Sequence, residues 1–156
     1  MNPLYLLDTN VVLALLRGGA LGAFIEATYG LRRVGLRPLI SVVTHGEMRV
    51  LAARNGWGDN RRAAMQRALD ALVTVDIHVA AVIEAYAQVD IYSQQHPDGA
   101  RNMGKNDLWL AACTVASGAT LLTTDRDFDH LIPSESNPTP LLAGRYIDPS
   151  SRLSTG

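Results

Sequence analysis

The sequence has a single cysteine, Cys113, and a single lysine, Lys105, among its 156 residues. One cysteine excludes a disulfide framework within the chain, and its apolar surroundings favour a buried thiol over a nucleophile. The sequence contains thirteen arginines and one lysine against fifteen acids, so its formal net charge is −1. The chain therefore has no global field that would attract a polyanion, and any such site must be local.

Long apolar runs are also missing. The amino-terminal region is apolar but is interrupted by Asp8, and the segment Val11–Leu16 is too short for a signal-peptide core or a membrane span. We therefore expect a cytoplasmic protein without a membrane association. A chain of this length buries roughly 70% of its unfolded surface in one domain, so we expect one domain over residues 1–148 and a frayed tail over residues 149–156.

Short apolar or β-branched segments alternate with segments of helical periodicity. The predicted strands are Pro3–Leu7, Pro38–Val43, Val73–Ile77, Ala119–Thr124 and an edge strand at Leu141–Ile147. The predicted helices are Val11–Leu16, Leu21–Tyr29, Met48–Arg54, Arg61–Leu72, Val79–Gln95 and Leu108–Ala116. This order predicts an α/β fold, a three-layer domain with a mainly parallel central sheet flanked by helices.

Four acids lie either at the end of a predicted strand or at the start of a predicted helix. Asp8 ends the first strand, Glu47 opens the helix after the second, Asp107 opens a later helix, and Asp125 ends the strand after it. Strand carboxyl ends and helix amino ends share one edge of a parallel sheet, which is where such folds bind ligands.

Each of these acids alone is compatible with a helix cap. Four carboxylates at one cleft, however, repel one another unless a cation neutralises them. Mg²⁺ or Mn²⁺ prefers oxygen ligands and is commonly bound by carboxylates together with a substrate phosphate. The pattern therefore points to phosphoryl chemistry.

Four short motifs contain these acids: Asp8-Thr9-Asn10 after the first strand, Glu47 in THGEM, Asn106-Asp107 before LWLAAC, and TTDRDFDHL after a short strand. Together they resemble the PIN-domain ribonucleases, and most closely the VapC-type toxins of bacterial and archaeal toxin–antitoxin pairs. The resemblance extends from Leu4 to about Ile147. The segment Leu31–Arg37 and the loop Pro133–Pro140 match no motif, and they could tune the choice of partner or substrate.

The resemblance implies a Mg²⁺- or Mn²⁺-dependent endoribonuclease whose products carry a 5′-phosphate and a 3′-hydroxyl. Asp8, Glu47, Asp107 and Asp125 would be its catalytic acids, with Glu47 reaching the metal partly through water. Asp127 is either a further ligand or a solvated loop acid. Four residues would orient the acids or position the substrate: Thr9, Asn10, Asn106 and Thr124. A small antitoxin would be the cognate partner, and a homodimer is expected.

An RNA substrate requires positive charge near the acidic cleft. Four cationic residues lie close to the motifs in the sequence and are candidates for RNA binding: Lys105, Arg101, Arg17 and Arg49. Each is equally compatible with ordinary surface charge.

Two other functions remain open at this stage. A phosphatase of the haloacid-dehalogenase type also uses an aspartate after the first strand, but it needs an acid two residues later as proton donor. Asn10 occupies that place, and an amide cannot serve. A non-catalytic binding module with the same fold is the other alternative.

Overall fold

The structure is a computed structural model that describes residues 2–156. Its centre is a five-stranded sheet in the order β3-β2-β1-β4-β5, with every neighbouring pair parallel. The strands are β1 (Tyr5–Leu7), β2 (Leu39–Ser41), β3 (Val73–Val75), β4 (Thr120–Thr123) and β5 (Ala143–Tyr146). The helices are α1 (Thr9–Arg17), α2 (Ala20–Tyr29), α3 (Val42–Arg54), α4 (Asp59–Asp70), α5 (Ala80–Gln94), α6 (Lys105–Ser117) and the 3₁₀ helix η1 (Arg126–Leu131).

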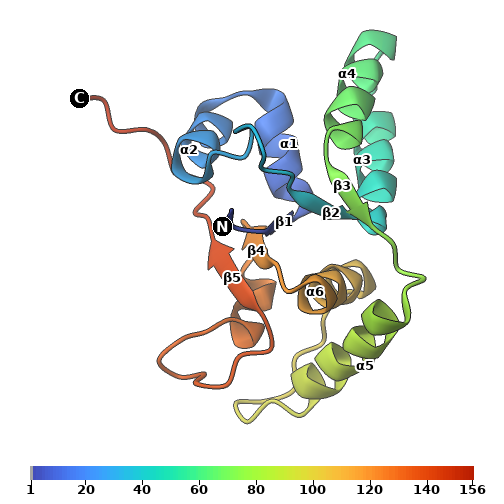
Figure 1. Cartoon of the computed structure of the whole chain (residues 1–156), viewed down its shortest axis with the longest axis vertical. Coiled ribbons are helices and arrows are strands. Elements are labelled where there is room, and N and C mark those ends of the chain that lie inside the picture. The colour runs from blue at the N-terminus through green and yellow to red at the C-terminus, as the bar shows by residue number, and fades with distance from the viewer. Residues whose placement is uncertain (1) are drawn as a thin grey trace.

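The sheet separates two hydrophobic cores, because successive side chains of a strand point to opposite faces. Leu6 and Leu121 pack on one face with residues of α5 and α6. Leu7 and Leu122 pack on the other face with residues of α1, α3 and α4. All four leucines are fully buried, and Figure 1 shows helices on both sides of the sheet. The predicted three-layer α/β architecture is confirmed.

The boundary between β2 and α3 differs from the prediction. The strand Pro38–Val43 was expected, with a helix from Met48, but β2 ends at Ser41 and α3 begins at Val42. The Ser41 hydroxyl accepts a hydrogen bond from the Val43 amide at 3.1 Å and so caps the helix. The interpretation that Glu47 opens this helix was therefore wrong, because Glu47 lies in the second turn of α3.

Smaller differences occur at the other strands. β3 and β5 are shorter than the segments Val73–Ile77 and Leu141–Ile147 that were predicted. The helix η1 was not predicted, because its sequence, RDFDHL, is rich in acids and lacks helical periodicity. Asp125 caps it by accepting a hydrogen bond from the Asp127 amide at 2.9 Å, and this turn fixes where both acids lie.

The two segments without a motif are both anchored to the domain. In the first, Leu31 is buried in the core beneath α1. In the loop Pro133–Pro140, the buried side chain of Asn137 donates to the carbonyls of His130 and Ile132, at 3.0 and 3.3 Å. The Tyr92 hydroxyl of α5 donates to Asn137 at 3.2 Å. This loop is therefore tied to both η1 and α5.

Helices α1 and α2 approach each other closely at Gly22. A Cβ atom added there would lie 2.4 Å from the Ala14 carbonyl oxygen, which belongs to helix backbone and cannot easily move. We expect Gly22→Ala to lower the free energy of unfolding by about 1–3 kcal/mol. Gly46→Ala is the matched control: it lies in α3 with open space around it, and should raise stability by roughly 0.5–1 kcal/mol. Urea denaturation measures both, and equal effects would contradict the close packing.

No single helix in the described range 2–156 is long and apolar enough to cross a membrane. The consecutive helices α1 and α2 are long and apolar enough for a span only when taken together, and a bend of 109° lies between them. Their apolar side chains, among them Val11, Leu13 and Ile25, pack in the hydrophobic core.

Candidate functional site

The site lies where the strand order of the sheet reverses. β1 and β4 are neighbours in the sheet, and the chain runs outward from β1 through β2 to β3 and from β4 to β5. Ligands of open α/β sheets bind outside the strand carboxyl ends at such a reversal. Asp8 directly follows β1, and Asp125 follows β4 after one residue. The topology therefore brings together two acids that are far apart in the sequence.

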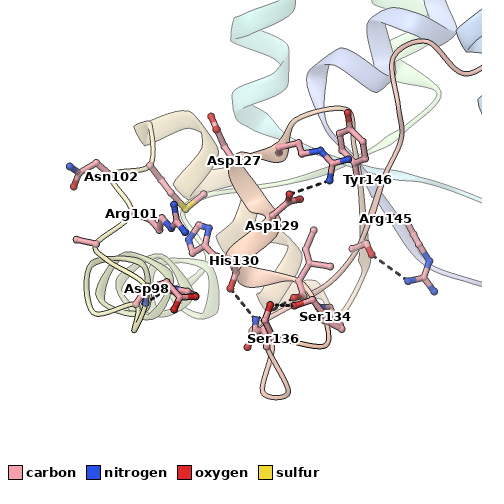
Figure 2. Close-up of a pocket in the computed structure, with 18 residues that line it drawn as sticks. Asp98, Arg101, Asn102, Asp127, Asp129, His130, Ser134, Ser136, Arg145 and Tyr146 are labelled. Carbon is pink, nitrogen blue, oxygen red and sulfur yellow. Dashed lines mark hydrogen bonds and ion pairs between the residues drawn. The ribbon is translucent and has the colours of Figure 1, made fainter.

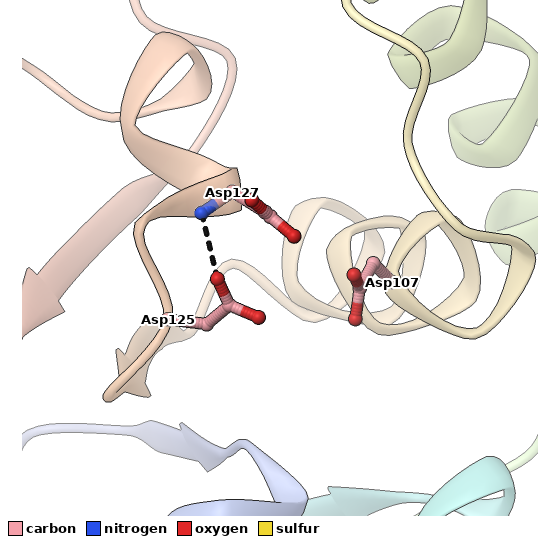
Figure 3. Close-up of side chains that lie close together, drawn as sticks. All are labelled: Asp107, Asp125 and Asp127. Atoms are coloured by element: carbon pink, nitrogen blue, oxygen red, sulfur yellow. Dashed lines mark hydrogen bonds between the residues drawn. The ribbon is translucent and has the colours of Figure 1, made fainter.

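Four acids line a cleft of about 680 Å³ at this edge: Asp8, Glu47, Asp107 and Asp125. Carboxylate oxygens of Asp107, Asp125 and Asp127 lie within 4.8 Å of one another. Figure 3 shows Asp107 on α6 facing Asp125 and Asp127 across the cleft. The acids singled out in the sequence therefore gather in one place, and Asp127 adjoins them from an exposed position.

The electrostatics of the cleft favour a bound cation. Burial first, and then the charges of the neighbouring acids Asp8 and Asp125, raise the pKa of Asp107 to about 7. Burial also raises the pKa of Asp8. Within residues 2–156 the one ion pair joins Arg126 and Asp129, so no cationic side chain is paired with the cleft acids. A hard divalent ion with oxygen ligands fits this set of donors.

Threonines hold the acids in place. The Thr123 hydroxyl donates to Asp8 Oδ2 at 2.7 Å and accepts from the Asp125 amide at 2.9 Å. The Thr9 hydroxyl donates to Glu47 Oε1 at 2.8 Å. Thr9 was among the predicted residues, whereas Thr123 was missed. Its position at the end of a strand, two residues before an acid, is the signal that could have identified it.

The other polar residues predicted for the site lie in different surroundings. Asn10 and Asn106 are exposed and line the acidic cleft. Thr124 lines a separate hollow together with Arg17 and Gly19. It is therefore Thr123, and not Thr124, that bonds to the acids.

The cations predicted to bind RNA are scattered. Arg49 donates to the His45 carbonyl and to Gln66 of α4, at 3.0 and 2.9 Å, and so lies along the α3–α4 surface. Lys105 is exposed in the first turn of α6. Arg101 lines a larger hollow that adjoins the cleft at Asp127.

Arg54 was missed by the sequence interpretation, yet it lines the acidic cleft. It follows Glu47 by seven residues on α3, and two helical turns return to the same face. The helical period could therefore have identified Arg54, had α3 been predicted from its true start.

The sequence of residues 5–132 matches the PIN domain family. No curated protein sequence matches the chain. Among solved structures, the chain is similar to VapBC2 from Rickettsia felis bound to a DNA fragment from the VapBC2 promoter, with 19% identity and a TM-score of 0.72. It is also similar to DNA-bound VapBC from Salmonella typhimurium, with 16% identity and a TM-score of 0.72.

A third similar structure is VapBC-5 from Mycobacterium tuberculosis, a member of the VapBC family of toxin–antitoxin systems, with 21% identity and a TM-score of 0.58. Each of these three comparisons covers 92% of this chain and 98% of the other. At such identities the likeness establishes a common fold.

Proposed function

The chain belongs to the PIN-domain family, and from that premise we propose that it is a metal-dependent endoribonuclease, the toxin of a VapC-type toxin–antitoxin pair. The observation that carries this proposal is the cleft itself. Four carboxylates from four separate segments meet at the strand-order reversal, with no cationic side chain paired to them among residues 2–156. Such a set of oxygen donors suits phosphoryl chemistry with a divalent ion.

Asp8, Asp107 and Asp125 would hold the ion, with Glu47 acting partly through water. The closeness of the Asp127 oxygen to those of Asp107 and Asp125 supports Asp127 as a further ligand. When bound, Mg²⁺ or Mn²⁺ would lower the pKa of an attacking water and neutralise charge on the phosphate.

The chain's own residues prepare this site. The Thr123 hydroxyl donates to Asp8 Oδ2, which favours the charged carboxylate and fixes its orientation. The Thr9 hydroxyl likewise donates to Glu47 Oε1 and so helps to fix the orientation of that carboxylate. Arg54 at the cleft wall is placed to contact a substrate phosphate, a role for which its planar guanidinium is suited. Asn10 and Asn106, which are exposed in the cleft, would position the RNA.

The proposed partner is an antitoxin protein, because the similar VapBC-5 structure is described as a member of a family of toxin–antitoxin systems. We also propose a homodimer and a cytoplasmic location, where RNA substrates are found. The partly buried apolar residues of α1 and α2, such as Leu16, Leu21 and Phe24, are candidates for the dimer contact. Light scattering of the purified chain with and without its antitoxin would measure both associations.

Cleavage of total cellular RNA by the purified chain tests the proposed activity. We expect discrete fragments with Mg²⁺ or Mn²⁺, none with EDTA, and new ends that carry a 5′-phosphate and a 3′-hydroxyl. Absence of cleavage with either metal, in folded protein free of antitoxin, would favour the binding module. Hydrolysis of phosphate monoesters in place of RNA would favour the phosphatase, although the amide of Asn10 argues against that chemistry.

Thr123→Val should lower the affinity for Mn²⁺ by roughly 10–100-fold, because Asp8 loses the hydroxyl that orients it. Titration calorimetry measures this effect. Thr114→Val is the control, since Thr114 is equally buried but donates to the Leu110 carbonyl within α6, at 2.9 Å. If both variants bind Mn²⁺ like the wild type, the role assigned to Thr123 is wrong.

A further inference from the structure

A hollow of about 940 Å³ lies beside the acidic cleft. It is enclosed by the connection between α5 and α6, by η1, and by the loop that leads to β5 (Figure 2). Asp127 lines this hollow, and its carboxylate also adjoins those of Asp107 and Asp125. A nucleic acid strand bound across the acidic cleft would therefore pass directly into the hollow.

Three groups that carry or can acquire positive charge gather on one wall of the hollow: His96, Arg101 and His130. The ring centroids of His96 and His130 are 5.7 Å apart, and Figure 2 shows the Arg101 guanidinium beside the His130 ring. An arginine beside two imidazoles gives this wall nitrogen donors that can face an anion.

Among residues 2–156, the acids of the hollow form no ion pair with this wall. Asp129 is paired with Arg126 at 3.3 Å, and Arg126 also lies over the Tyr146 ring, 3.7 Å from its centroid. Asp127 belongs to the acidic cluster. Asp98 lines the hollow from an exposed turn, and within residues 2–156 it forms no ion pair with the wall.

The wall is held rigidly by Ser93, a fully buried residue of α5. The Ser93 hydroxyl lies 2.8 Å from His130 Nε2, and the Ser93 carbonyl accepts the Arg101 amide at 2.8 Å. Asn137 holds the His130 carbonyl from the other side at 3.0 Å. Positions fixed before binding lower the entropic cost of engaging a ligand.

We infer that His96, Arg101 and His130 form a phosphate-binding subsite that holds the RNA strand beside the scissile bond, on the Asp127 side of the acidic cleft. Arginine is suited to this role because its guanidinium can engage a phosphate with two hydrogen bonds. The inference rests on the proposed ribonuclease function and adds to it the place where the substrate backbone is gripped.

Steady-state cleavage kinetics test the subsite. We expect Arg101→Ala to raise KM roughly tenfold, the loss of one charge-assisted hydrogen bond, while kcat changes less than about twofold because Arg101 does not touch the reacting atoms. Arg101→Lys should restore part of the affinity, since it keeps the charge. The control is Arg67→Ala, an exposed arginine of α4, which should leave both constants unchanged. An unchanged KM for Arg101→Ala would overturn the inference.

A binding measurement that needs no cleavage separates this inference from the proposed function. In Asp107→Asn protein with EDTA, the imidazole NMR signals of His96 and His130 should shift on addition of a short single-stranded RNA. The signals of His45 and His78 should not shift, and Arg101→Ala should abolish the response. A response in Asp107→Asn, together with no cleavage by the wild-type protein with Mg²⁺ or Mn²⁺, would support the subsite and refute the nuclease. Cleavage by the wild-type protein without any response in Asp107→Asn would refute the subsite alone. A response to polyglutamate but not to RNA would assign the hollow to a protein partner.

Discussion

Asp107→Asn should reduce the rate of RNA cleavage on the order of a thousandfold, because the divalent ion contributes several kcal/mol of transition-state stabilisation. The same substitution should leave the fold intact or more stable. Burial and the other acids raise the pKa of Asp107 to about 7, so a neutral amide relieves repulsion in the cleft. Asp8→Asn should behave alike, since the asparagine oxygen can still accept the hydrogen bond from Thr123.

Single-turnover cleavage and thermal unfolding of the same preparations measure the two effects. Glu84→Gln is the control, because it removes one charge from an exposed position on α5 that does not line the cleft. It should leave the cleavage rate unchanged. Cleavage by Asp107→Asn at the wild-type rate would remove Asp107 from the site, and loss of the fold would show that its carboxylate is structural.

Metal-free protein should lose stability as the pH rises from about 4 to 7. Asp107 titrates at 3.8 when unfolded and at about 7 when folded, so over this window the folded state retains a proton that the unfolded state has released. The free energy of unfolding therefore falls with increasing pH. We expect a loss of roughly 1–3 kcal/mol, reduced from the full shift because the cleft is partly open to solvent.

Mn²⁺ should reverse this loss, and it should stabilise the protein more at about pH 7.5 than at about pH 5, because a ligating carboxylate must be deprotonated. Urea denaturation across this pH range, with and without Mn²⁺, measures both effects. Asp107→Asn isolates the contribution of this group and should show a flatter pH dependence without metal. Identical slopes for the two proteins would contradict the raised pKa of Asp107 in the folded state.

The sheet and the convergence of the acids could be predicted from local sequence. Buried parallel strands read as short apolar runs, and the rule that strand carboxyl ends share one edge places Asp8 beside Asp125. Both acids lie where this rule puts them, in one cleft with Asp107. The prediction succeeded because it needed only strand identity and direction, and no side-chain detail.

The start of α3 could not be predicted in the same way. Its first turns contain Val42, Val43, Thr44 and Gly46, which are β-branched residues or glycine and are weak helix formers. Local propensity therefore favoured extending the strand to Val43, whereas the Ser41 cap and packing of Met48 in the core settled the helix.

The contacts that complete the site depend on distant pairs, which a single sequence does not reveal. Thr123 bonds to Asp8 across a separation of 115 residues. Likewise, Ser93 meets His130 across a separation of 37 residues, and it meets Arg101 through its carbonyl oxygen. Such pairs follow from the register of the sheet and the path of loops, so they became visible only in three dimensions.

The most direct test of the metal centre is the position of Mn²⁺ in crystals of the protein, located by its anomalous scattering. We expect a peak bounded by the carboxylates of Asp8, Asp107 and Asp125 in the wild type, and no peak at that position in Asp107→Asn. Wild-type crystals grown with saturating Mn²⁺ that show no peak among these three acids would contradict a metal-dependent site at this edge of the sheet.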